Sequence, residues 1–115
     1  DADSALIEKT RAMPLRAPLV LVVIATIIEH VKVPAQEQLI TAGCAAHGVL
    51  LAAQAQGVGA VWRTGNVAEM PAVTARLGLQ DNEQVVAYMY LGTPSNALRN
   101  PPAVDPAPYV QAWPQ

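Results

Sequence analysis

The stretch QEQLITAGCAAHGVLLAAQAQGVGAVWRTG (residues 36–65) joins a long apolar segment to a short one through Gly57. Pro34, just before it, suits the first turn of a helix, and Gly57 stands where a C-terminal cap belongs. Apolar residues nearly encircle the long segment, which predicts a buried helix over 34–57 that packs on a sheet on one side and against another surface on the other. The residues VGAVWRT (58–64) then predict a short buried strand.

The other segments alternate between helix and strand. Residues 19–28 are rich in β-branched side chains and show no alternation, so they predict a central strand covered on both faces. The proline-rich residues 95–115 predict an extended tail that lies over a surface and is anchored by Tyr109 and Trp113. We therefore expect one domain portion over 1–94, followed by that tail. The domain portion is also expected to contain a short helix over 2–13, a short helix over about 70–77 and a buried strand over 84–94.

Composition excludes several classes of protein. The 115 residues are 52% hydrophobic and carry a net charge of −2 with seven basic residues, so a nucleic-acid partner lacks its electrostatic basis. One cysteine excludes an internal disulfide and a cysteine-rich zinc site. The longest uncharged apolar run, residues 17–28, is too short to cross a bilayer as a helix. These features favour a cytoplasmic protein without a membrane partner.

The apolar content comes mainly from alanine and valine, and phenylalanine is absent. Each buried contact is therefore small, and a partner chain would cover more area. The sequence begins DADSALIEK, with no methionine, as if approaching a helix. We expect it to be the middle of a longer protein.

Several segments, in this order, resemble the FMN-dependent NAD(P)H nitroreductase family, and its small bacterial branch in particular. The family's N-terminal segment, with an Arg/Ser cluster that holds FMN, has no counterpart in this chain. The resemblance implies an α+β fold with a central mixed β-sheet, helices packed around it and a long buried dimer-interface helix, with FMN at the subunit interface. It rests on RAPLVLVVIA (16–25), HVKVP (30–34), the block 36–65, VAYMYLGTP (86–94) and the proline-rich VDPAPYV (104–110).

The resemblance also implies cofactor-binding residues. A backbone N–H near the flavin N5 and a nearby cation would tune hydride transfer, and glycines would let the backbone approach the ring closely. No residue is expected to act as a catalytic group of its own or as a metal ligand. The residues matched to flavin contacts are Trp62, Arg63, Thr64 and Gly65, and those matched to nicotinamide-nucleotide contacts are Ala52, Ala53, Gln54, Ala55, Gln56 and Gly57.

Structural roles compete with these assignments. Arg63 also fits a solvated strand end, and Trp62 fits a core residue. Arg99 follows the last strand and could reach the FMN phosphate, although its local sequence is not close to the family pattern. His47 fits an interface position better than a catalytic one, and Cys44 fits a small core residue because no neighbouring cation would lower its pKa.

The function implied is an oxidoreductase that passes hydride from NAD(P)H through FMN to a nitroaromatic, a quinone or a similar small-molecule acceptor, working as a homodimer. The alternatives are a non-catalytic folded fragment, or a flavin-binding dimerisation module that lacks the N-terminal FMN-binding segment.

Overall fold

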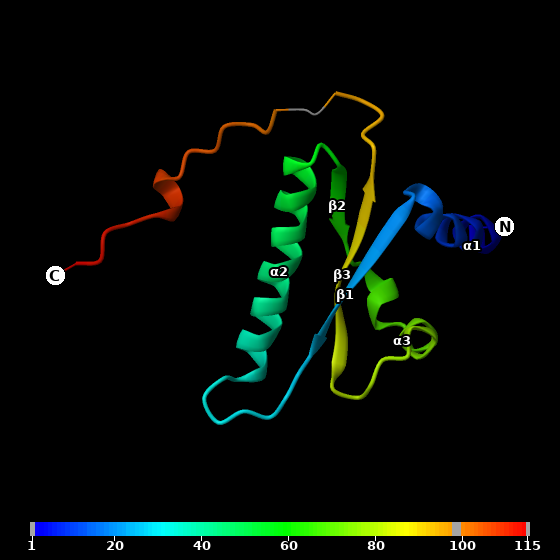
Figure 1. Cartoon of the computed structure of the whole chain (residues 1–115), viewed down its shortest axis with the longest axis horizontal. Coiled ribbons are helices and arrows are strands. Elements are labelled where there is room, and N and C mark those ends of the chain that lie inside the picture. The colour runs from blue at the N-terminus through cyan, green and yellow to red at the C-terminus, as the bar shows by residue number, and fades with distance from the viewer. Residues whose placement is uncertain (1, 98–99, 115) are drawn as a thin grey trace.

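The computed structural model of the chain describes residues 2–97 and 100–114. The described residues form an α+β fold, as expected, with helices on both sides of one sheet (Figure 1). The α-helices are α1 (Ala2–Ala12), α2 (Ala35–Ala55) and α3 (Pro71–Leu77), the strands are β1 (Leu19–Thr26), β2 (Gly59–Arg63) and β3 (Glu83–Gly92), and the 3-10 helices are η1 (Met13–Arg16), η2 (Asn66–Glu69) and η3 (Ala107–Tyr109).

The sheet has the strand order β1-β3-β2, and both pairings are antiparallel. The expectation of a mixed sheet is therefore not met in the described part of the chain. The expectation that 19–28 forms the central strand is also wrong, because β3 occupies the centre and β1 an edge. Both faces of β1 are apolar, because one packs toward α2 and the other lines a groove on the opposite side of the sheet. An apolar run therefore does not distinguish an edge strand from a central one here.

β2 is the opposite edge strand, and it is more exposed than the prediction of a buried strand implied. Val61, Trp62 and Arg63 are exposed, and only its first two residues are half-buried. β2 is exposed because it forms an edge of the sheet, and no described strand pairs with its outer side. β3, by contrast, is the buried strand that the sequence predicts, with Ala87 and Met89 fully buried.

The core lies between the sheet and one side of α2. Ala46 of α2 packs with Ala87 and Met89 of β3, and partly buried Val49 and Leu50 extend this cluster. The small side chains bring the helix close to the sheet, as the alanine-rich composition predicts. The core is thin, because α2 is the only α-helix among the described residues that packs against all three strands.

The other side of α2 faces outward and is apolar. Ile40 and Leu51 are each 56% exposed, and Cys44 and His47 are exposed as well. The expected buried helix is thus buried on one side only within this chain. α2 is also long and apolar enough to cross a membrane, a criterion of length and composition that core helices meet too.

The tail does not lie over the domain. It leaves the end of β3 and passes beyond the C-terminal end of α2 (Figure 1). Tyr109 is 80% exposed and Trp113 is 91% exposed, so neither anchors it to this chain. The radius of gyration, 18.0 Å, exceeds the roughly 13 Å expected of a compact chain of this length.

Candidate functional site

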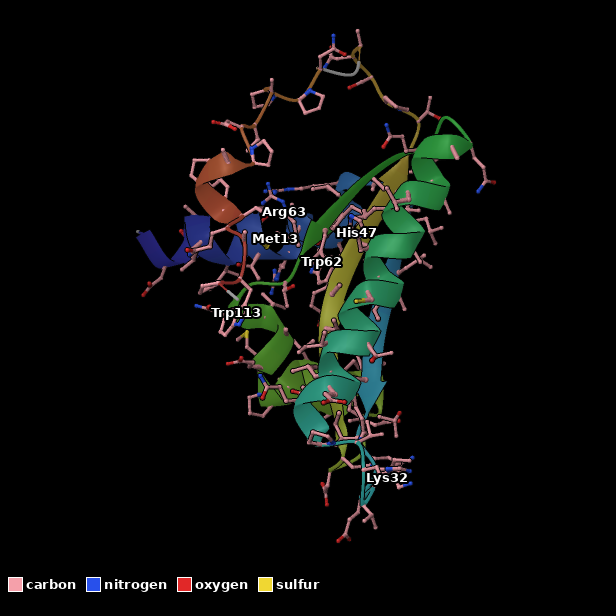
Figure 2. The ribbon with its side chains drawn as sticks, turned by 90° about the vertical axis from the view of Figure 1, so that its left-hand side faces the viewer. Met13, Lys32, His47, Trp62, Arg63 and Trp113 are labelled. Carbon is pink, nitrogen blue, oxygen red and sulfur yellow. The ribbon has the colours of Figure 1, made fainter. Side chains whose placement is uncertain are left out.

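Trp62 and Arg63 project to opposite faces of the sheet, because successive side chains of a strand alternate. Trp62 faces α2, where its ring lies 3.8 Å from the position that a Cβ on Gly43 would take. Arg63 faces the other side and lines a groove together with Met13 of η1. Figure 2 shows Arg63 beside Met13, away from α2. The two neighbouring residues expected to contact flavin therefore do not share one surface.

Thr64 fixes the Trp62 ring. The Trp62 Nε1–H donates to the Thr64 Oγ1 at 2.9 Å, and the Thr64 hydroxyl donates to the carbonyl of Val86 at 3.2 Å. That carbonyl lies at a β-bulge, because Val23 pairs with Ala87 and Ile24 with Val85 and leaves Val86 unpaired between them. The end of β2 is thus tied to β3 through an irregularity in β3.

The groove lies on the sheet face opposite α2 and has a volume of about 1140 Å³. Its floor is formed by the side chains that point away from α2 on all three strands. One wall comes from η1 and the other from η2 and α3. Among the lining residues are Val20, Val22, Val61, Tyr88 and Tyr90 from the strands, Met13 and Arg16 from η1, and Asn66, Val67 and Val73 from the other wall.

Tyr88 sits in the groove with a buried hydroxyl that has no hydrogen-bond partner within the described residues. Burial, and secondarily the neighbouring Tyr90, raises the pKa of the Tyr88 hydroxyl. Tyr88 is the cross-strand partner of Arg63. The hydroxyl therefore stays protonated at neutral pH, buried beside the groove.

Gly65 follows at the rim of the groove with a backbone conformation that other residues avoid. Its φ is 65° and its ψ is −179°, a region populated almost only by glycine. No heavy atom lies within 4 Å of the position that a Cβ would take. The backbone is therefore open to the groove, which Arg63, Thr64 and Gly65 all line.

The segment 52–57 lies elsewhere, at the C-terminal end of α2. Ala52, Ala53 and Gln56 line a smaller hollow of about 420 Å³. Ala53 is only 5% exposed, and its carbonyl accepts the backbone N–H groups of Gln56 and Val58. Gly57 ends the helix with a φ of 72°, the capping role that the sequence predicts. Gln54, Ala55 and Gly57 do not line the hollow.

The two hollows meet at one edge of the sheet. Both are lined by Pro18, Gly92 and Thr93, so ligands in the two would be neighbours. Gly92 permits this junction, since a Cβ there would lie 2.8 Å from a ring atom of Pro18. Arg99, considered for the flavin phosphate, lies outside the described residues.

Sequence reasoning missed three residues of the groove: Arg16, Tyr88 and Tyr90. The alternation Tyr88, Met89, Tyr90 carried a usable signal, because it places two tyrosines on one face and the core methionine on the other. Arg16 carried no such signal. Its position follows from the 3-10 helix η1, most of which lies outside the elements that the sequence predicts.

With this geometry established, comparison with known proteins identifies the class. The sequence profile of the nitroreductase family matches residues 3–93. The chain therefore belongs to the nitroreductase family, as the resemblance implied. Within the described residues the family match includes most of the residues that line the groove, the rim at Gly65 and all of α2.

Two curated relatives refine this assignment. The Escherichia coli K12 protein named "Putative NAD(P)H nitroreductase YdjA" is 41% identical over 113 residues, which cover 95% of this chain and 60% of that protein. A Haemophilus influenzae protein named "Putative NAD(P)H nitroreductase" is 40% identical over 86 residues, which cover 74% and 47% respectively. The chain thus spans at most about three fifths of these relatives.

Solved structures confirm the fold. A nitroreductase-like family protein from Bacillus cereus superposes with a TM-score of 0.79 at 18% identity, over 97% of this chain and 60% of that one. Nitroreductase A from Vibrio parahaemolyticus superposes with a TM-score of 0.71 at 24% identity, over 96% and 51%. At these identities the likeness concerns architecture alone.

Proposed function

We propose that the protein containing this chain is an oxidoreductase that binds FMN and passes hydride from NAD(P)H, through the flavin, to a nitroaromatic, a quinone or a similar acceptor. The observation that carries the proposal is the position of Arg63, Thr64 and Gly65 at the rim of one large groove, in a chain of the nitroreductase family. The matched relatives bear the name NAD(P)H nitroreductase.

The residues of the groove fit an aromatic cofactor. Its volume of about 1140 Å³ exceeds the roughly 300–1,000 Å³ of ordinary small-molecule pockets. Valine and tyrosine side chains offer apolar surface to a flat ring, and Gly65 leaves free the space that any side chain would fill. Trp62 is the exception, because its indole faces α2 and only its backbone remains for a flavin contact.

FMN, when bound, supplies the hydride-accepting and hydride-donating chemistry. The residues of this chain position it and adjust its charge balance. Arg63 places a positive charge beside the groove, which favours a ring that gains negative charge on reduction. Thr64 is held by Trp62 and Val86, so the rim is rigid. A flavin ring lying on the valines of the floor would displace water there, which would strengthen these electrostatic effects.

The nicotinamide nucleotide is assigned to the end of α2. Ala52 and Gln56 are the exposed members of the segment beside the smaller hollow. The side chain of Ala53 is buried, so this residue would contribute to the nucleotide site through the backbone around it. The shared edge at Gly92 would bring a nucleotide there next to a ligand in the groove, as hydride transfer requires.

We further propose that the protein is a cytoplasmic homodimer built on the outward apolar side of α2. Ile40 and Leu51 are the large side chains exposed there. A second α2 packed on this side would complete the burial that the sequence pattern predicts.

We also propose that residues 1–94 form the domain portion of this chain and that residues 95–115 form a separate tail.

One alternative has a specific observation in its favour. The chain spans about three fifths of the E. coli relative, and its sheet is covered by a long helix on one face only. In that case these residues alone would form a folded fragment, or a flavin-binding dimerisation module, that does not oxidise NAD(P)H.

The experiment is an FMN titration of the purified chain, followed by absorbance spectra and mass analysis of the flavin released on denaturation. NADH and NADPH oxidation is then measured with a nitroaromatic and with a quinone. We expect Arg63→Ala to weaken FMN retention, and the matched Arg76→Ala, on α3 outside the groove, to leave it unchanged. Bound FMN with turnover supports the oxidoreductase, bound FMN without turnover supports the module, and no bound FMN rejects both for this chain.

A further inference from the structure

Two side chains of the kinds that bind transition metals stand on the outward side of α2. Cys44 and His47 are both exposed, and Figure 2, which labels His47, shows α2 in front of the sheet. The two residues are three positions apart in the helix, so they are neighbours on its surface, with Cβ atoms roughly 5–6 Å apart. A cysteine thiolate and a neutral imidazole are both ligands that zinc prefers. Each chain therefore presents half of a four-ligand set.

One chain alone does not complete this set. No group of three or more histidine, cysteine, aspartate or glutamate side chains that could hold a metal ion lies within the residues that the structure describes. Cys44 and His47 line neither the groove nor the smaller hollow, so they are separate from the proposed flavin and nucleotide sites. A metal site at this position therefore needs ligands from a second copy of the chain.

The outward residues of α2 are arranged symmetrically about a point midway between Cys44 and His47. Ile40 precedes Cys44 by four positions, and Leu51 follows His47 by four. Ile40 and Leu51 are the large apolar side chains on this side, and each is 56% exposed. If two copies of α2 cross antiparallel on a two-fold axis at this point, Ile40 of each copy packs on Leu51 of the other, because such an interface pairs residues reciprocally. The same register sets Cys44 of each copy opposite His47 of the other.

The composition of α2 permits a close crossing. Ala45 and Gly48 are exposed beside the two ligands, and no atom lies within 4 Å of the position that a Cβ on Gly48 would take. Within α2, Glu37 is the only aspartate, glutamate, lysine or arginine, and it lies in the first turn, so the crossing desolvates no such charge. The apolar pairs at the two ends would enclose two thiols and two imidazoles, and polar groups removed from water need partners.

We propose that Cys44 and His47 of two copies form a tetrahedral zinc site at the centre of an α2–α2 interface, with two sulfur and two nitrogen ligands. The proposal rests on the homodimer proposed above and uses no property of the flavin site. Each thiol releases its proton on binding, and each imidazole binds through a neutral nitrogen. The ion satisfies all four polar groups at once and ties the two chains together.

The test is titration of the reduced, metal-free chain with Co²⁺, followed by competition with Zn²⁺. Tetrahedral cobalt with thiolate ligands has intense visible absorption and an ultraviolet charge-transfer band, whereas zinc has neither. We expect the cobalt bands to saturate at one ion for two chains and to disappear on addition of Zn²⁺. Cys44→Ser and His47→Gln should each lose the bands. His30→Gln, which removes the other of the two histidines, is the matched control and should keep them.

Leu51→Asp tests whether two copies are needed. It keeps both ligands in each chain but removes the apolar contact at each end of the crossing, so we expect a monomer without cobalt bands. Bands of undiminished strength in Leu51→Asp, or in Cys44→Ser, would show adventitious metal binding and overturn the proposal. Circular dichroism establishes that each variant is folded, and Cys44→Ser, a nearly isosteric change at an exposed position, serves if Leu51→Asp does not fold.

Sedimentation in EDTA and in Zn²⁺ separates this proposal from that of the homodimer. A dimer in EDTA that gives no cobalt bands overturns the metal site and leaves the homodimer standing. A dimer in EDTA that gives the bands supports both. A monomer in EDTA that dimerises in Zn²⁺ supports the site and makes the interface depend on the metal. A monomer in both solutions overturns the two proposals together.

Discussion

The Trp62 indole N–H and the Thr64 hydroxyl oxygen are 2.9 Å apart, and the same hydroxyl donates to the Val86 carbonyl at 3.2 Å. One side chain thus satisfies an indole donor on β2 and the carbonyl of Val86, the bulge residue of β3. It also holds the strand end that leads to Gly65. The orientation of Trp62 against α2 and the position of the groove rim depend on the same hydroxyl.

Replacing Thr64 by valine should destabilise the chain. The hydroxyl is lost while the shape is kept, so the Val86 carbonyl loses its partner in a half-buried setting and the more exposed Trp62 N–H loses its acceptor. We expect the free energy of unfolding to fall by about 1–2 kcal/mol. Urea denaturation followed by tryptophan fluorescence measures this. Thr41→Val, at an exposed hydroxyl that bonds only the Glu37 carbonyl, should change it by less than about 0.5 kcal/mol.

Replacing Gly65 by alanine should also destabilise the chain, through the backbone alone. The position has a φ of 65° and a ψ of −179°, yet no atom lies within 4 Å of the added Cβ. We expect a loss of about 1–3 kcal/mol. The measurement is thermal unfolding. Gly48→Ala is the control, because it lies within α2 with equally open space and should stabilise by up to about 1 kcal/mol.

The outward side of α2 predicts the oligomeric state. Leu51 is 56% exposed in the single chain, so Leu51→Asp costs the monomer little. If two copies pack through this side, the buried carboxylate should shift the sedimentation coefficient from that of a dimer to that of a monomer. Val31→Asp, at a fully exposed loop position, should leave the dimer intact. An unchanged sedimentation coefficient for Leu51→Asp would exclude this side as the interface.

Tyr88 predicts a loss of stability at high pH. Burial raises the pKa of its hydroxyl, so the folded chain keeps the proton at pH values where the unfolded chain releases it. The stabilisation is complete below the unfolded pKa of about 10, and is lost as the pH rises through the folded value. Absorbance at 295 nm should show one late-titrating tyrosine, which Tyr88→Phe removes and Tyr109→Phe does not. Three tyrosines titrating together would contradict the burial of this hydroxyl.

The sequence predicts the local elements better than their placement. The bounds of α2, its cap at Gly57 and the buried strand β3 follow from periodicity, glycine position and apolar runs. The central position expected of 19–28 does not hold, because its two apolar faces reflect α2 on one side and the groove on the other. Strand order is a long-range property that neither propensity nor pattern contains.

The candidate site was predicted only in part, for a related reason. Arg63, Thr64 and Gly65 are matched by family resemblance and do meet at one groove. Trp62 is separated from them by strand alternation, which the sequence already contained. Tyr88 was missed because the burial of its hydroxyl without a partner is a tertiary fact that no sequence pattern contains. Tyr109 and Trp113 show the converse, since aromatic residues in a tail do not imply a surface on the same chain.

The bulge at Val86 has a consequence for how this sheet tolerates insertions and deletions. Val86 and Ala87 are neighbours in sequence, yet both pack toward α2. Strict alternation along β3 is therefore interrupted at this point, while the pairs on either side, Val23 with Ala87 and Ile24 with Val85, stay in register. Deleting Val86 would join Val85 to Ala87 in regular alternation, so Met89 would still face α2 and Tyr88 and Tyr90 would still face the groove. Deleting one of the regularly paired residues between Ala87 and Met89 would instead exchange the two faces for the rest of the strand.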